Sequence, residues 1–90
     1  MKEATHIIVH GRVQGVWFRA GTKEKADELG LLGWVKNRPE GTVEIHAEGE
    51  KLLLEKFIAW CRIGTPPADV ISIDIGEVMV QECKSFEIHS

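Results

Sequence analysis

The sequence has little of what marks several common classes of protein. Cys61 and Cys83 are the only two cysteines, and they lack the C-x-x-C spacing of a zinc or redox site, so we expect two reduced thiols. The opening stretch MKEATHIIVH holds only three consecutive apolar residues, too few for a signal-peptide core or a membrane span. Repeats, low-complexity tracts and linkers are also missing. These absences favour a cytoplasmic protein without a membrane anchor.

Length and composition set the scale of the fold. The 90 residues suffice for one hydrophobic core, so we expect a single domain over residues 1–90 and a single site. A hydrophobic share of 43% and a charged share of 28% are ordinary for a globular protein.

Charge is distributed unevenly along the chain. The formal net charge of -3 argues against a general affinity for nucleic acid. Residues 11–25 are nevertheless locally basic. Their charged members are Arg12, Arg19, Lys23, Lys25 and Glu24. A basic island on an acidic protein fits a small anionic ligand better than a polyanion.

One stretch within this island, GRVQGVWFRAG, has a composition that suggests binding in addition to structure. Its glycines and arginines are Gly11, Gly15, Gly21, Arg12 and Arg19. This mixture suggests backbone amides and guanidinium groups directed at an anion. The stretch lacks the Lys-Ser or Lys-Thr pair of a Walker loop, a carboxylate pair for magnesium, and a Ser or Cys nucleophile. A tight turn beside a solvated arginine is the structural alternative.

Hydrophobic periodicity predicts alternating strands and helices. The predicted strands cover 5–13, 32–37, 42–49, 69–80 and 85–90, and the predicted helices cover 18–29 and 50–64. The order is βαββαβ with an added short C-terminal strand. For so short a chain it indicates an α+β ferredoxin-like sandwich, in which two helices cover one face of an antiparallel sheet.

This topology has a consequence for the site. The helix between the first two strands makes them parallel, and the third strand inserts between them. The glycine loop and Asn37, at the end of the second strand, should therefore lie side by side, roughly 10 Å apart. The loop leads into a helix N-terminus, whose free N–H groups attract anions, and Arg19 in the first turn calls for a negative partner. Asn37 also has a structural interpretation, since asparagine often begins turns.

The predicted outward faces of the central strands argue against RNA binding, which needs exposed aromatics there. These positions are His6, Ile8, His10, Glu44, His46 and Glu48. The histidines, His89 included, show no metal-like clustering, so we expect them on the surface and expect no metal site. The tryptophans Trp17, Trp34 and Trp60 are expected in the core or at its rim.

The stretches GRVQGVWFR, GWVKN, GTVE and GTPPADV resemble those of the acylphosphatases, small ferredoxin-like enzymes that hydrolyse acyl phosphates to a carboxylate and inorganic phosphate. The resemblance implies that Arg19 and loop amides hold the phosphoryl group while Asn37 positions the attacking water for in-line displacement. The loop residues so implied are Gln14, Gly15, Val16, Trp17 and Phe18. Two departures, the RPEG turn and the ending IHS in place of a closing aromatic, are expected to affect local stability only.

Arg19, the loop amides and Asn37 can suffice for catalysis because phosphoryl transfer depends mainly on positioning and charge stabilisation. A carboxylate leaving group, whose conjugate acid has a pKa of about 4, departs without an acid or a metal. We therefore expect a monomer that needs no cofactor and takes a small acyl phosphate. The alternative is a regulatory domain that binds phosphate or another anion without catalysis.

Overall fold

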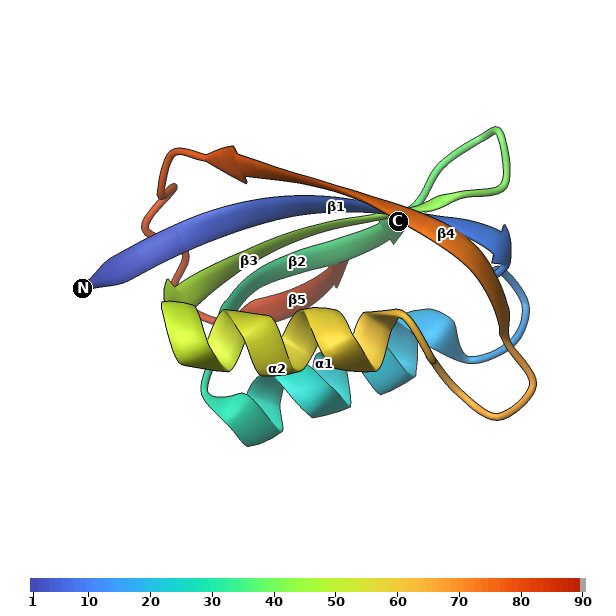
Figure 1. The fold of residues 1–90 in the computed structure, drawn as a ribbon, viewed down its shortest axis with the longest axis horizontal. Helices are drawn as coiled ribbons and strands as arrows, with labels where there is room; N and C mark the ends of the chain where they lie inside the picture. Colours follow the sequence, from blue (N-terminus) through green and yellow to red (C-terminus); the bar gives the residue numbers. More distant parts are fainter. Residues whose placement is uncertain (90) are drawn as a thin grey trace.

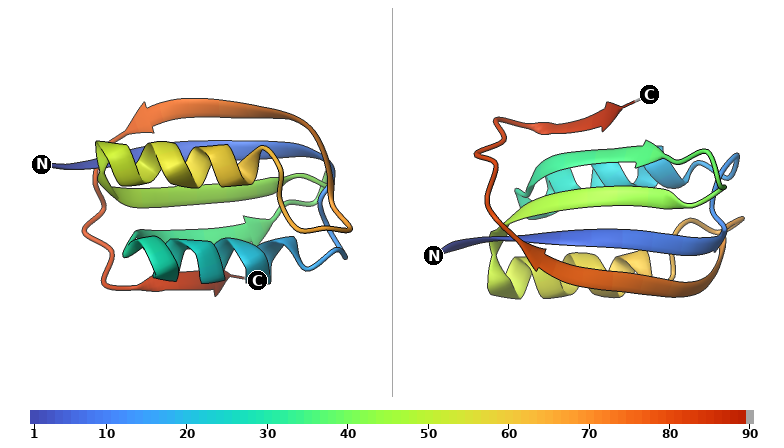
Figure 2. Two further views of the ribbon diagram at one scale, coloured as in Figure 1. Left: turned by 60° about the horizontal axis from the view of Figure 1, so that its bottom comes forward. Right: turned by 90° about the horizontal axis from the view of Figure 1, so that it is seen from above.

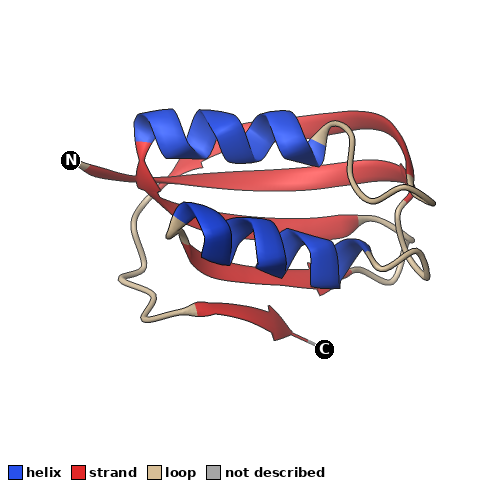
Figure 3. Cartoon of the chain, turned by 90° about the horizontal axis from the view of Figure 1, so that it is seen from below, coloured by secondary structure: helices blue, strands red, loops and turns tan. Residues whose placement is uncertain are grey.

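The computed structural model describes residues 1–89 and shows two helices packed on one face of a five-stranded sheet (Figures 1 and 3). The elements are β1 (Lys2–Arg12), α1 (Phe18–Leu29), β2 (Leu32–Asn37), β3 (Val43–Glu50), α2 (Lys51–Cys61), β4 (Asp69–Val78) and β5 (Phe86–His89). The strand order β4-β1-β3-β2-β5 places β3 between β1 and β2, as predicted. The ferredoxin-like α+β class is thus confirmed.

Local signals in the sequence explain where α1 begins and ends. The helix begins after the glycine loop and ends at Gly30, whose φ of 72° is the left-handed conformation that glycine adopts without strain. Its buried residues Phe18, Thr22 and Ala26 are four apart and form the stripe that faces the sheet. Both bounds agree with the prediction.

The last strand makes the sheet mixed. β5 runs parallel to β2, with Val35 opposite Ile88, whereas the other neighbouring strands pair antiparallel as predicted. Apolar alternation tells which face a strand buries but says nothing of its direction. Here the direction follows from residues 79–85, which cross the strand ends from β4 at one edge to β5 at the other (Figure 2, right).

The core lies between the helices and the inner face of the sheet. Its fully buried members include Ile7, Val9, Val35, Val43, Ile45, Ala47 and Phe57. On β3, Val43, Ile45 and Ala47 therefore face the core, opposite to the predicted outward positions Glu44, His46 and Glu48. No helix within residues 1–89 is long and apolar enough to span a membrane. Both cysteines are free thiols, and burial raises the pKa of Cys61 to about 12.

The outer face of β3 departs from the prediction. His46 and Glu48, expected in solvent, are 1% and 0% exposed. The Trp34 ring stacks on the His46 ring, with centroids 5.8 Å apart, and the segment after β4 covers Glu48. The expectation of surface histidines was therefore wrong for His46, because periodicity assigns a residue to a face without showing what covers that face.

Glu48 is the centre of a buried polar cluster. Its carboxylate accepts hydrogen bonds from His46 Nε2 at 2.7 Å and from the backbone N–H groups of Gln81 and Cys83, and it lies 3.7 Å from Lys2 Nζ. His46, Glu48 and Cys83 bring potential metal-ligating atoms within 4.8 Å of one another, a clustering that the sequence did not predict. Because protein groups already occupy the carboxylate oxygens, we assign this cluster the structural role of fastening residues 79–85 to the sheet.

We expect Glu48→Gln to lower the free energy of unfolding by about 1–3 kcal/mol, because an amide cannot accept the same set of N–H groups. Urea titration measures the loss. Glu55→Gln, on the exposed surface of α2, is the matched control and should change little.

The loss should depend on pH. Burial by itself raises the pKa of Glu48, but the hydrogen bonds from His46, Gln81 and Cys83 outweigh it and hold the pKa below its ordinary value of 4.5. This stabilisation is therefore present above pH 4.5 and disappears as the pH falls through the lower folded-state pKa. The two proteins should converge in stability in acid, and a difference that stays constant across that range would contradict this role.

Candidate functional site

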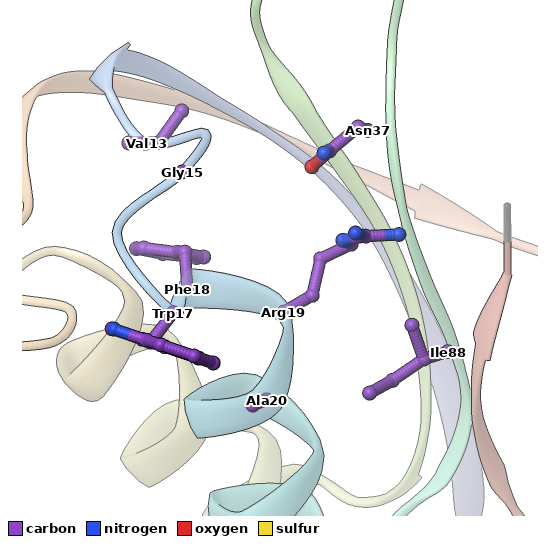
Figure 4. Close-up of a pocket in the computed structure, with 8 residues that line it drawn as sticks. All are labelled: Val13, Gly15, Trp17, Phe18, Arg19, Ala20, Asn37 and Ile88. Atoms are coloured by element: carbon purple, nitrogen blue, oxygen red, sulfur yellow. The ribbon is translucent and has the colours of Figure 1, made fainter.

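A pocket of about 340 Å³ opens where the loop between β1 and α1 meets the end of β2 (Figure 4). Its lining residues are Val13, Gly15, Trp17, Phe18, Arg19, Ala20, Asn37 and Ile88. The glycine loop and Asn37 therefore lie together, as the strand order predicts.

Asn37 faces this pocket because of its position on β2. Side chains alternate between the two faces of a strand, so Asn37 shares the helix-covered face with Val35, which is 0% exposed. It is the last residue of the strand and pairs with Val43 of β3. Its side chain thus projects beside the beginning of α1 (Figure 4).

The loop is fixed on two sides. Gln14 Nε2 donates to the carbonyl oxygens of Arg38 and Thr42, both at 2.8 Å, and thereby ties the loop to the turn after β2. Thr65 Oγ1 donates to the Val16 carbonyl at 2.6 Å from the segment after α2. These bonds hold the loop backbone in place beside the N-terminus of α1.

The five loop residues predicted to bind phosphate fall into two groups, those that line the pocket and those that do not. Gln14 and Val16 do not line the pocket: Gln14 is the cross-link just described, and Val16 is 2% exposed in the core. Gly15, Trp17 and Phe18 do line it. For Gln14 and Val16, whose side chains are engaged elsewhere, the backbone is the part that can meet a ligand.

The three glycines of the GRVQGVWFRAG stretch lie in different surroundings. Gly15, with a φ of 73°, lies in the loop and lines the pocket. Gly11 lies at a bulge in β1, where a Cβ would stand 2.1 Å from the Asp69 carbonyl oxygen. Gly21 lies inside α1 against Trp60. Only Gly15 therefore contributes to the pocket, and the other two serve packing.

Arg19 supplies the positive charge of the pocket. The first turn of α1 holds no acidic residue, and within residues 1–89 no carboxylate forms an ion pair with Arg19. Its guanidinium donates to the His89 carbonyl at 3.2 Å. By contrast, Lys23 pairs with Asp27, and Lys25 with Glu28. Among the charged residues of the basic island, Arg19 alone lines this pocket, beside the N-terminus of α1.

The side-chain oxygen of Asn37 completes the polar part of the pocket. Asn37 Oδ1 is buried and has no hydrogen-bond partner among residues 1–89. Buried polar atoms in proteins are nearly always paired. This oxygen can therefore accept a hydrogen bond from a small molecule in the pocket.

The sequence analysis did not identify two residues of β5 that contribute to the pocket. Ile88 lines the pocket, and the His89 carbonyl receives the hydrogen bond from Arg19. The expectation that the IHS ending concerns local stability only is therefore too narrow for Ile88 and His89, and Ser90 lies outside the described residues. The sequence predicted a strand over 85–90, but only the parallel pairing of β5 with β2 brings it to this site.

Known proteins resemble this chain in sequence. A family model described as Acylphosphatase matches residues 5–88. The acylphosphatase of Methylococcus capsulatus is 52% identical over 75 residues, which cover 83% of this chain and 82% of that protein. That of Nitrosococcus oceani is 43% identical over 88 residues, covering 98% and 99% of the two chains.

The same likeness holds in three dimensions. A crystal structure of the acylphosphatase from Bacillus subtilis matches with a TM-score of 0.95 and 41% identity, over 100% of both chains. The resemblance carried by the glycine loop is confirmed by this match and by the relatives in sequence: the chain belongs to the acylphosphatase family.

Proposed function

We propose that the pocket between the glycine loop and Asn37 hydrolyses acyl phosphates to a carboxylate and inorganic phosphate. Family and fold support the reaction. One observation supports this location: the same pocket is lined by Arg19, which has no acidic partner within residues 1–89, and by an Asn37 oxygen that has no donor among those residues.

The loop and Arg19 hold the phosphoryl group in this mechanism. Backbone N–H groups of residues 14–18 and the positive end of the α1 dipole attract the anion. The guanidinium of Arg19 offers a planar fork of donors that matches two phosphoryl oxygens. Together they neutralise the charge on the equatorial oxygens as the transition state forms.

Asn37 positions the nucleophile. Its Oδ1 accepts a hydrogen bond from a water, whose oxygen then attacks phosphorus in line with the bond to the acyl oxygen. The P–O bond to the acyl group breaks, and its electron pair leaves with the carboxylate. The water's proton passes to a phosphoryl oxygen of the substrate, so the products are the carboxylate and inorganic phosphate. Alignment of this kind supplies part of the roughly 7–11 kcal/mol that good orientation offers.

We expect the protein to release phosphate from benzoyl phosphate in excess EDTA, with inorganic phosphate as a competitive inhibitor, because the cradle fits the product as well as the substrate. A colorimetric phosphate assay measures the release. Activity that disappears in EDTA and returns with magnesium would contradict the mechanism. Phosphate binding without turnover would instead support the noncatalytic anion-binding domain.

Asn37→Ala should lower kcat by at least about 100-fold, the scale of a lost positioning group, while KM and phosphate affinity change little. Steady-state kinetics and phosphate titration measure the two effects separately. A folded variant with nearly parental kcat would remove Asn37 from the mechanism. Loss of phosphate binding would make it a ligand-holding residue.

Arg19→Lys should behave differently, because Arg19 contacts the phosphoryl oxygens in both the ground and transition states. Lysine keeps the charge but loses the fork of donors, so kcat should fall and KM should rise together. The same kinetic assay compares both variants. Parental values of kcat and KM in Arg19→Lys would show that the loop is a structural turn without a role in binding phosphate.

A further inference from the structure

Trp17 stands apart from the other two tryptophans. Trp60 packs against Phe18 with ring centroids 5.5 Å apart, and Trp34 stacks on His46 and His89. Trp17 is 78% exposed, although it immediately precedes α1 and lines the pocket. The sequence analysis expected it in the core or at its rim, and the structure places its ring at the surface.

The backbone explains why the Trp17 side chain points outward. Val16 and Phe18, the residues on either side, are both buried in the core at 2% and 1% exposure. Trp17 lies between them with a φ of 65° and a ψ of 18°, a left-handed conformation that bulky residues rarely adopt. Glycine would fit this backbone without strain, so neither packing nor backbone geometry accounts for an indole here.

The pocket beside Trp17 has a polar side and an apolar side. In Figure 4, Gly15 and Asn37 lie above the Arg19 side chain, Ala20 and Ile88 lie below it, and Trp17 lies to its left at the start of α1. Ile88 comes from β5 and is 43% exposed, so a second exposed apolar side chain lines the pocket, on the part away from Asn37 (Figure 4). A phosphoryl group fits the polar side and makes no use of the apolar one.

The direction of the proposed reaction assigns this apolar side to the acyl group. In-line displacement places the leaving group opposite the attacking water. The water lies at Asn37, so the acyl group extends away from Asn37, toward Trp17 and Ile88. The pocket's volume of about 340 Å³ exceeds that of a phosphoryl group, which takes up roughly 100 Å³, the space of three or four waters.

We propose that Trp17 and Ile88 form the binding surface for the acyl group and make the protein select acyl phosphates with an aromatic or large apolar acyl group over small ones such as acetyl phosphate. The inference rests on the proposed function for the orientation of the substrate. An aromatic acyl group stacks on the exposed indole face and covers Ile88, whereas an acetyl group reaches neither fully.

Binding of two non-hydrolysable probes tests the proposal without depending on turnover. Benzylphosphonate and methylphosphonate share the phosphoryl oxygens and differ in the apolar group. Isothermal titration should show that the parental protein prefers benzylphosphonate and that Trp17→Ala reduces the ratio of the two affinities about tenfold, which is about 1.4 kcal/mol. Such a change is the size expected for a lost aromatic contact.

Two further variants and a control separate this role from damage to the loop. Trp17→Phe keeps an aromatic face and should restore most of the ratio, and Ile88→Ala should reduce it by a smaller factor. Leu52→Ala removes another exposed apolar side chain, 73% exposed on α2, and should leave the ratio at its parental value. For the same variants, the ratio of kcat/KM for benzoyl phosphate to kcat/KM for acetyl phosphate is then measured and should change in the same way.

An unchanged ratio in Trp17→Ala overturns the proposal, even if both probes bind more weakly, because equal weakening reports a disturbed loop. A ratio that Trp17→Phe fails to restore overturns the stacking role. Selective binding by a protein that hydrolyses neither acyl phosphate supports the acyl surface and refutes the proposed hydrolysis, so the two failures are distinguishable.

Discussion

The pairing of β3 with both β1 and β2 is the constraint on which the rest of the structure depends. The inner residues Val43, Ile45 and Ala47 are completely buried, so a slip of one residue would turn this apolar row toward solvent. With the register fixed, Asn37 lies opposite Val43, and β2 ends beside the loop that follows β1. The distance between the two halves of the pocket is thus set by the width of one intervening strand.

Some residues of the loop fix its path, and others line the pocket. Buried Val16 and Phe18 and the hydrogen bonds of Gln14 fix its path, and Gly15 and Arg19 line the pocket. Preorganised donors of this kind need no movement when charge develops on a bound group. A site built this way suits a reaction whose leaving group departs unaided.

The far end of the sheet also serves the pocket. Glu48 fastens the segment after β4 across the strand ends, and that segment leads into β5 at the opposite edge (Figure 2). β5 then runs parallel to β2 and brings Ile88 and the His89 carbonyl to Arg19. A buried carboxylate on the outer face thus helps to place residues at a site on the inner face.

The sequence by itself determined the element order, the bounds of α1, the inner face of β3 and the meeting of the glycine loop with Asn37. Each depends on local periodicity, on glycine conformation, or on the parallel direction that a crossover helix imposes. Only the tertiary structure decided the burial of His46 and Glu48, the direction of β5, and the exposure of Trp17. Periodicity shows which side chains share a face, but what covers a face, and which distant strand joins an edge, depends on contacts between segments far apart in the chain.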